Sequence, residues 1–275
     1  MEPLKSINAV ELVYGLEPER TLLDDPSEAY HEASKLYPTL AWRQTDAAML
    51  ERNPHALITT TRSVKQLRHL RYVALPPPAF GDAALGDVLS TRRSRQSFAS
   101  APISLEQLAT LAFAACGVTQ RIPVANGGTL VLRTAPSGGA LYPLDLYIAV
   151  HRVDGLAPGL YFYDPVDHAL AVVRETSLMD ECVGACIYPD AVSTSSATMF
   201  LSAMLWRSRF KYRYRAYRFT AIEAGHIAQN VLLTAHALGL GGVPLGGFYD
   251  TAVEKLLAID GVNEAALYAI SVGAI

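Results

Sequence analysis

The sequence predicts a large domain that mixes helices and strands, with an extension before it. From Asp82 onward, helical and strand patterns alternate in a compact α/β order, whereas residues 1–80 hold short helical pieces separated by prolines. One long segment, which ends at Gly239, has helical spacing and is apolar almost all round, so it belongs inside the fold. Hydrophobic residues make up 51% of the 275-residue chain and charged residues 18%, which is enough for a sizeable core.

The composition argues against several classes of protein. A formal net charge of −3 disfavours nucleic acid or an anionic membrane as a partner. The N-terminus lacks the apolar segment of a signal peptide, and no apolar run approaches 18 residues, so we expect a cytoplasmic protein without a membrane span. Cys116, Cys182 and Cys186 include no CxxC pair, so we expect buried, reduced thiols and no metal site.

Residues 1–80 are expected to form an N-terminal helical extension, and residues 81–275 the main domain. Residues 27–36 alternate acids and bases as on a solvated helix. Residues 62–72 place apolar side chains against a basic stripe, which predicts a second helical piece with a solvated face. Three consecutive prolines at 76–78 then predict a stiff, extended connection.

The main domain is expected to alternate helices and strands along its length. A helix is predicted between Ser104, as the N-cap, and Gly117, with shorter helices at residues 84–89, 179–187 and 251–257. Strands are predicted at residues 130–134, 144–150, 159–164, 169–173, 197–205 and 265–272. The turn between residues 164 and 169 predicts a hairpin.

The long apolar helix is expected to begin at Thr220, because Thr220 and Glu223 stand in capping-box order, and to stop at Gly239. Its residues 222–238 are too apolar to face water, which predicts a homodimer. A narrow polar stripe needs partners inside the protein, and it consists of Glu223, His226, Asn230 and Thr234. A simpler interpretation is a core helix with an arginine-rich lead-in and a loop after it.

Two short clusters suit an anion or a flat ligand. Arg92, Arg93 and Ser94 follow a predicted helix, and two planar guanidinium groups with a hydroxyl suit a phosphate. Exposed arginine pairs are common at helix ends, so this signal alone is weak. In residues 136–139 (PSGG), adjacent glycines let backbone amides approach a ligand that a β-carbon would hold off. The alternative is a turn between two strands.

The segment 239–248 holds five glycines within nine residues. It follows a helix, so it is not the dinucleotide fingerprint, which must follow a strand. We expect a turn or loop whose backbone passes close to something flat or bulky.

A fourth cluster, residues 207–219, alternates arginine or lysine with aromatic residues. As a strand it would have one basic and one aromatic face, with Lys211 and Tyr212 on opposite sides. On a helix or loop these two side chains could converge. A nucleic-acid-binding ribbon is disfavoured, because this is a single strip in an acidic chain.

Taken in order, the clusters resemble the SagB-type dehydrogenases of the nitroreductase superfamily, which are FMN-dependent azoline oxidases. The similarity covers nearly the whole chain and rests on YHEASKL (30–36), RRSxxxF (92–98), PSGGALYP (136–143), KYxxRxYRF (211–219) followed by EAGHxxQN (223–230), and PLGGF (244–248). Any one of these motifs is weak, but their common order is specific.

The resemblance implies an α+β fold with a mixed or antiparallel sheet flanked by helices, which dimerises through its long helix and holds two FMN molecules at the interface. It implies that Lys211 and Tyr212 are the catalytic pair. The residues expected to bind FMN are Arg92, Arg93, Ser94, Gln96, Pro136, Ser137, Gly138, Gly139, Asn230, Pro244, Leu245, Gly246 and Gly247. Gln96 stands where the family commonly has an arginine or lysine, and no basic residue follows the last strand, so we expect a weaker hold on FMN.

The expected reaction converts thiazoline or oxazoline rings in a ribosomally made precursor peptide to thiazoles or oxazoles. It needs a base, an orienting donor and a flavin as electron acceptor. Lys211 has Arg209 and Arg213 nearby in sequence, which would disfavour its ammonium form and make it a better base. Tyr212 would share the proton transfer or hold the ring. The expected partners are the peptide, a second copy of the chain and a cyclodehydratase. The alternatives are a flavin oxidoreductase acting on a small molecule and a flavin-binding scaffold subunit.

Overall fold

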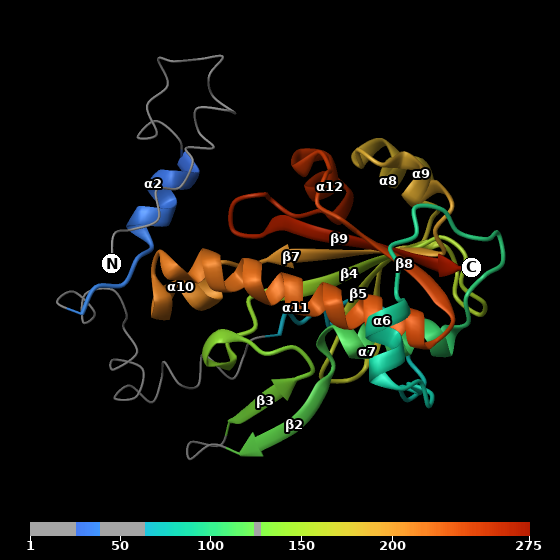
Figure 1. Cartoon of the computed structure of the whole chain (residues 1–275), viewed down its shortest axis with the longest axis horizontal. Helices are drawn as coiled ribbons and strands as arrows, with labels where there is room; N and C mark the ends of the chain where they lie inside the picture. Colours follow the sequence, from blue (N-terminus) through green and yellow to red (C-terminus); the bar gives the residue numbers. More distant parts are fainter. Residues whose placement is uncertain (1–25, 39–63, 124–127) are drawn as a thin grey trace. The chain divides into compact units, whose positions relative to one another are not determined.

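A computed structural model describes residues 26–38, 64–123 and 128–275 (Figure 1). The chain divides into two compact units, residues 1–44 and residues 45–275. In the first unit, helix α2 (Pro26–Ala33) confirms the helix predicted for residues 27–36, although it ends earlier. The Ser34 hydroxyl donates to the His31 carbonyl oxygen just after the last turn.

The second unit is built on a seven-stranded sheet in the order β1-β6-β5-β4-β7-β9-β8, in which every neighbouring pair is antiparallel (Figure 1). Its strands are β1 (Tyr72–Ala74), β4 (Leu144–Val150), β5 (Gly159–Asp164), β6 (Ala169–Arg174), β7 (Ala197–Ala203), β8 (Leu240–Leu245) and β9 (Ala265–Ala274). Strands β2 (Val118–Pro123) and β3 (Thr129–Arg133) form a separate two-stranded ladder. The α+β class is therefore confirmed, and the sheet is antiparallel.

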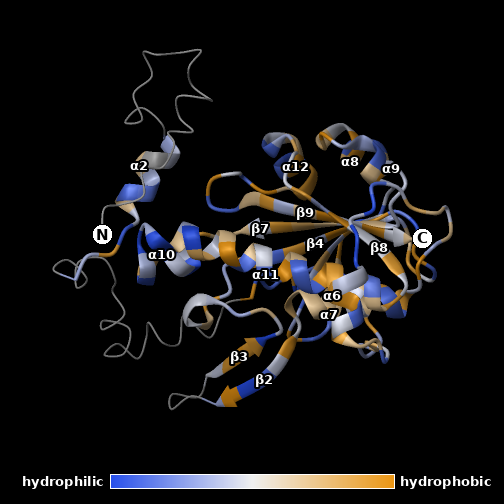
Figure 2. Ribbon diagram, in the orientation of Figure 1, coloured by the Kyte–Doolittle hydropathy of each residue, from blue (hydrophilic) through white to orange (hydrophobic). Residues whose placement is uncertain are grey.

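Helices cover both faces of the sheet. The helices are α6 (Leu85–Thr91), α7 (Leu105–Cys116), α8 (Met179–Ala185), α9 (Pro189–Ser193), α10 (Trp206–Tyr212), α11 (Arg215–Ala237) and α12 (Asp250–Leu257). Along β4, Leu146 and Ile148 pack into one core cluster with α7 and α11, whereas Tyr147 and Ala149 pack into another with α8 and α12. Because both faces are covered, all seven residues of β4 are buried, and the central strands are largely apolar (Figure 2).

Several elements were predicted at nearly the observed residues from local sequence signals. Helix α7 begins with the capping box of Ser104 and Gln107 and ends at Gly117, as predicted. The predicted β5–β6 hairpin is present. Among the predicted short elements, 84–89, 130–134, 179–187, 197–205, 251–257 and 265–272 appear with shifted ends as α6, β3, α8, β7, α12 and β9. Strands β1, β2 and β8 and helix α9 had not been predicted.

The long helix α11 begins at Arg215, five residues before the predicted start, so the prediction of Thr220 as its N-cap was wrong. Thr220 lies in the helix interior, where its hydroxyl donates to the Ala216 carbonyl oxygen at 2.9 Å. Gly239, with a φ of +71°, follows the helix and ends it as predicted.

Residues 64–71 are not helical, so this part of the predicted second helical piece was wrong; residues 62 and 63 lie outside the described part of the chain. The segment turns into strand β1, and Arg71 accepts a backbone hydrogen bond from Val172 at 2.8 Å. Pairing with the edge of β6 therefore outweighs the helical spacing. Residues 72–74, predicted to belong to the extension, contribute a strand to the sheet, and residues 75–80 lack regular structure, as expected for the prolines.

The glycine-rich segment forms strand β8, not the predicted turn or loop. Gly241 pairs with Gly273 of β9, and Phe98 packs over both. A β-carbon on Gly241 or Gly273 would lie 3.1 or 2.8 Å from Phe98 atoms. The flat group that these two glycines accommodate is thus a side chain of the protein itself.

The three cysteines are free and buried, as predicted. Burial raises the pKa of Cys116 and of Cys182 to about 12, so both thiols stay protonated at neutral pH. None of the helices in the described part of the chain has the length and apolar character needed to cross a bilayer.

Candidate functional site

Lys211 and Tyr212 are the last two residues of the short helix α10, which follows β7 directly. Arg213, with a φ of +48°, breaks the helix, and α11 begins two residues later. The alternating basic and aromatic segment is thus helical, and the strand with two opposite faces is ruled out. Both catalytic candidates are half-buried.

The two side chains meet over the glycines of the PSGG motif. Gly139 has a φ of +64°, and a β-carbon built on it would lie 2.7 Å from Tyr212 Oη and 2.8 Å from Lys211 Nζ. A β-carbon on Gly138 would lie 3.2 Å from the Phe219 ring, which packs edge-on against Tyr212 with 5.0 Å between ring centroids. The structure therefore brings a lysine ammonium and a phenol together over a backbone that only glycine allows to approach so closely.

A buried carboxyl lies at the same end of the molecule. Glu223 of α11 is 3% exposed, and burial raises its pKa to about 7, although the Ser137 hydroxyl and Arg133 act to lower it. Ser137 Oγ accepts a hydrogen bond from the Tyr142 backbone at 2.9 Å. The Arg133 guanidinium lies 4.6 Å from the centre of the Tyr142 ring. Glu223 was noted in the polar stripe, whereas Arg133 had no sequence signal.

The rest of the polar stripe divides between packing and solvent. Asn230, expected to bind the cofactor, donates to the Ala114 carbonyl oxygen of α7 at 3.1 Å, so its amide ties the two helices together. Thr234 is buried and His226 is exposed. Of the four stripe residues, Glu223 is the one that lies at the Ser137–Gly139 loop.

The arginine cluster lies against β8. Ser94 forms an isolated parallel bridge with Gly242, and the Arg95 amide donates to the Gly242 carbonyl oxygen at 3.1 Å. Arg92 Nη1 lies 3.5 Å from Ser94 Oγ, so these two donors converge. Arg93 turns back and donates to backbone oxygens of Ser90 and of its neighbour Arg92.

Other predicted cofactor residues lie in three places. Gln96 is exposed beside the arginine cluster, and Pro136 is exposed beside Ser137. At the end of β8, Leu245 is 1% exposed and belongs to the core, so a ligand could reach only its backbone. Pro244 is half-buried, and Gly246 is exposed, with Tyr268 at 3.9 Å from the position of a β-carbon. Gly247 accepts a backbone hydrogen bond from Ile187 at 3.1 Å.

The two groups of candidate residues lie at opposite ends of α11. Thr91, beside the arginine cluster, bonds His236 in the last turn of the helix at 2.8 Å. Gly138 contacts Phe219 in the first turns. Phe219 and His236 are 17 residues apart, which is about 25 Å along a helix. We call the group Arg92–Ser94 the arginine end. We call the group formed by Lys211, Tyr212, Glu223 and residues 137–139 the lysine end.

The residues fit a flavin mononucleotide in two respects. Arg92 and Ser94 present the planar fork and hydroxyl that suit a phosphate. Gly246 is exposed, and a β-carbon on it would lie 3.9 Å from Tyr268, so a flat ring can approach the backbone there. By contrast, the residues that the structure describes contain no group of three His, Cys, Asp or Glu side chains that could hold a metal ion.

Three curated proteins are similar to the chain. A Methanocaldococcus jannaschii protein named as a nitroreductase is 35% identical over 182 residues, 66% of this chain and 88% of that protein. The trifolitoxin-processing protein TfxB of Rhizobium leguminosarum bv. trifolii is 29% identical over 62% of this chain and 47% of its own length. The microcin B17-processing protein McbC of Escherichia coli is 30% identical over 47% of this chain. The matches span about half the length of the last two relatives.

Solved structures and a family model agree on the fold. A crystal structure of an Anabaena variabilis protein named as a nitroreductase has a TM-score of 0.69 and 27% identity, covering 90% of this chain and 45% of that one. A chain of the E. coli microcin synthetase McbBCD complex, with truncated pro-MccB17 bound, has a TM-score of 0.56 and 21% identity. The match covers 94% of this chain and 98% of that one, and at this identity it supports a shared fold only. The nitroreductase family model matches residues 89–274. The chain belongs to the nitroreductase family.

Proposed function

We propose that this chain is an FMN-dependent dehydrogenase that oxidises thiazoline or oxazoline rings to thiazoles or oxazoles in a ribosomally made peptide. The observation that carries the proposal is the convergence of Lys211 and Tyr212 over Gly139. Two relatives are named for processing trifolitoxin and microcin B17, and this supports a processed precursor, which we propose is a peptide, as the substrate.

In the proposed reaction, the ring loses two hydrogens, one as a hydride and one as a proton. FMN, when bound, supplies the two-electron acceptor. Lys211 Nζ, in its neutral form, accepts the proton from the ring carbon, and Tyr212 Oη donates a hydrogen bond that orients the ring. The two atoms lie 2.7 and 2.8 Å from the β-carbon position of Gly139, so they are close enough to each other for one ring to contact both. Half-burial of the two side chains limits access of water to the reacting atoms.

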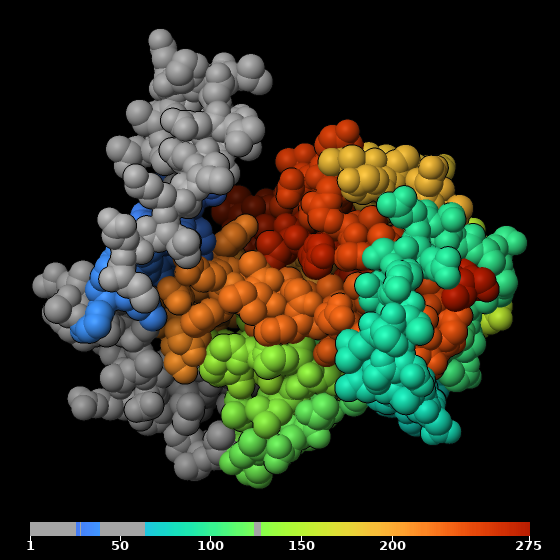
Figure 3. All heavy atoms as spheres, viewed as in Figure 1, coloured from blue at the N-terminus to red at the C-terminus, as the bar shows by residue number. Residues whose placement is uncertain are grey.

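Arg92 and Ser94 are proposed to hold the FMN phosphate, and the backbone at Gly246 to face the flavin ring. Within one chain the arginine end and the lysine end are about 25 Å apart along α11, farther than one FMN molecule reaches. We therefore propose a homodimer in which the arginine end of one copy and the lysine end of the other meet at the same flavin. Ala221, Ile222 and Gly225 of α11 are exposed, and Figure 3 shows α11 in orange on the visible face until the teal atoms around α6 cover it.

A second function is favoured by one observation. The M. jannaschii relative, matched over 88% of its length, is named as a nitroreductase, not as a peptide-processing protein. The same fold acting on a small molecule would need an external reductant such as NAD(P)H. For the peptide reaction, we propose a complex with a cyclodehydratase, because the McbBCD structure holds several chains together with a truncated precursor.

The mass of a cyclised precursor peptide tests the proposal. After incubation with the purified protein, FMN and air, without NAD(P)H, each oxidised ring should be lighter by two hydrogens. Denaturation of the protein should release FMN and not FAD. An unchanged peptide mass, together with flavin reduction by NAD(P)H and a small acceptor, would favour the second function.

A further inference from the structure

The helix that carries Lys211 and Tyr212 is poorly supported by its own sequence. Helix α10 is seven residues long, has no side-chain hydrogen bond at its N-cap Leu205, and ends at Arg213, whose φ is +48°. Helices this short are unstable in isolation, since few hydrogen bonds offset the cost of nucleation. The positions of both side chains therefore depend on contacts between α10 and the rest of the fold.

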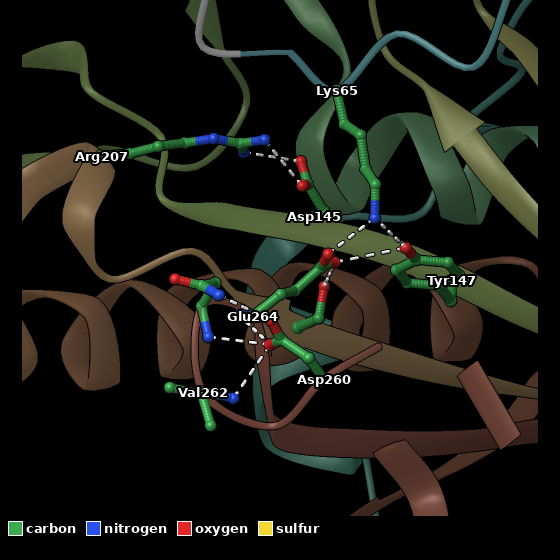
Figure 4. Close-up of polar contacts among 9 residues, drawn as sticks. Lys65, Asp145, Tyr147, Arg207, Asp260, Val262 and Glu264 are labelled. Atoms are coloured by element: carbon green, nitrogen blue, oxygen red, sulfur yellow. Dashed lines mark hydrogen bonds and ion pairs between the residues drawn. The ribbon is translucent and has the colours of Figure 1, made fainter. Parts of the chain in front are cut away.

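One of these contacts is a buried, two-pronged ion pair. Arg207, in the first turn of α10, donates from Nη1 and Nη2 to the two carboxylate oxygens of Asp145, at 2.8 and 2.9 Å (Figure 4). The side chains are 10% and 4% exposed. Asp145 belongs to β4, in the middle of the sheet. Two parallel hydrogen bonds fix the orientation of a guanidinium group as well as its distance.

The spacing along α10 connects this contact to the catalytic candidates. Lys211 follows Arg207 by four residues, so the two side chains lie on the same side of the helix, one turn apart. A rotation of α10 about its axis would break the hydrogen bonds to Asp145 and move Lys211 away from Gly139. Arg207 therefore fixes the rotation of the helix that carries the proposed base.

A second, partly buried ion pair lies next to the first, and no residue of α10 takes part in it. Lys65 Nζ lies 2.6 Å from Glu264 Oε2 and 2.6 Å from Tyr147 Oη (Figure 4). Glu264 also accepts a hydrogen bond from Ser202, which stands opposite Asp145 in the β4–β7 register. This pair lies on the same sheet face as the first, with side chains 24% and 7% exposed, so it provides a neighbouring control.

We propose that Arg207 is a positioning residue that holds Lys211 and Tyr212 over Gly139 through its pair with Asp145. The inference rests on the proposed function in one respect, namely that these two residues carry out the chemistry. The anchoring of α10 stands on the contacts alone and can be measured separately.

Two variants test the anchor. Arg207→Lys keeps the charge but loses the planar fork. The double variant Arg207→Met/Asp145→Val replaces the pair by apolar side chains, a change that buried ion pairs often tolerate without loss of stability. In both variants we expect faster amide hydrogen exchange in residues 206–212, with β4 unchanged. We also expect a changed rate of Lys211 acylation by an amine-reactive reagent. A misplacement of about 1 Å lowers kcat by about 100-fold, with bound FMN and KM retained.

Lys65→Met is the control, because Glu264 keeps the hydroxyl groups of Tyr147 and Ser202 as partners. Its exchange in residues 206–212 and its kcat should match the wild type. The proposal would be overturned if the double variant had the same hydrogen exchange in residues 206–212, the same rate of Lys211 acylation and the same kcat as the wild type. If Arg207→Lys fails to fold, the double variant decides. An inactive wild-type protein would reject the proposed function, while hydrogen exchange and acylation would still decide whether Arg207 positions Lys211.

Discussion

The arginine end and the lysine end of α11 are built in different ways. At the arginine end, the backbone is fixed by the bridge between Ser94 and Gly242, and half-buried Arg92 and exposed Ser94 present donors. At the lysine end, Lys211 and Tyr212 come from a short helix and are held half-buried over Gly139. One end offers hydrogen-bond donors on a fixed backbone, and the other offers titratable side chains whose positions depend on packing.

This difference separates binding from chemistry. Exposed donors can capture an anion, and losing one of them weakens affinity by a limited amount. Groups that transfer protons must be placed within hydrogen-bond reach of the reacting atom, so small displacements are costly. Substitutions at the lysine end should therefore change the rate, and substitutions at the arginine end should change cofactor affinity.

The largest effect is expected for Lys211→Ala combined with Tyr212→Phe. General acid–base groups contribute about 10²–10⁴-fold, so peptide oxidation should fall by that factor. Bound FMN and dimeric mass should not change, because neither residue is proposed to hold the phosphate. Absorbance of bound flavin, light scattering and peptide mass measure the three quantities. Full oxidation by the double variant would remove the catalytic role and leave a basic, aromatic surface.

The next effect concerns Glu223, the buried carboxyl of the lysine end. Its folded-state pKa of about 7 lies above the ordinary value of 4.5, so between these pH values the folded chain keeps a proton that the unfolded chain has lost. The free energy of unfolding should therefore fall as pH rises from about 4.5 to about 7, by about 3 kcal/mol at most. Urea unfolding at several pH values measures this slope, which Glu223→Gln should reduce. The control Glu175→Gln, at a half-exposed side chain, should leave it unchanged, and an equal slope in Glu223→Gln would contradict the prediction.

Gly139→Ala should disturb the lysine end through its backbone. The new β-carbon would be strained at a φ of +64° and would push against Tyr212 Oη and Lys211 Nζ. We expect kcat to fall by about 100-fold and the free energy of unfolding to fall by about 1 kcal/mol. Gly184→Ala is the control, because nothing lies within 4 Å of its β-carbon and it stands in helix α8. Unaltered kinetics in Gly139→Ala would show that the two side chains do not need this surface.

The smallest effect is expected at the arginine end. Arg92→Ala removes a charge-assisted hydrogen bond worth about 1.5–3 kcal/mol, so FMN should dissociate about 10- to 100-fold more readily. Excess FMN should restore activity. Arg93→Ala removes the same charge from a side chain that bonds its own backbone and should weaken binding less. Flavin fluorescence titration measures both. Equal affinities in wild type and Arg92→Ala would place the phosphate elsewhere.

The sequence predicts the elements whose signals are local. The capping box of Ser104 and Gln107 marks the start of α7. Strands β4 and β5 lie at the predicted residues. Elements that form by pairing with segments distant in the sequence could not be predicted from local signals. Strand β1 forms because β6 has an edge to pair, and β8 forms because β9 and Ser94 lie on its two sides.

The same division holds for the candidate site. Motif order points to Lys211, Tyr212 and residues 136–139, and the structure brings them together. The pairing of Arg207 with Asp145 could not be predicted, because 62 residues separate them and neither has a local signal. The setting of Glu223 likewise depends on burial, which a single sequence does not reveal.

The bridge between Ser94 and Gly242 also determines when the arginine end can exist. Its two residues are 148 positions apart in the chain, and ribosomes add about 5–20 residues per second. On the ribosome, the turn at Arg92–Ser94 thus waits about 7–30 s for its partner strand to be made. During that interval the nascent chain has no fixed backbone on which to place the two donors. An anion that needs this turn is consequently captured only after the chain has been synthesised as far as Gly242.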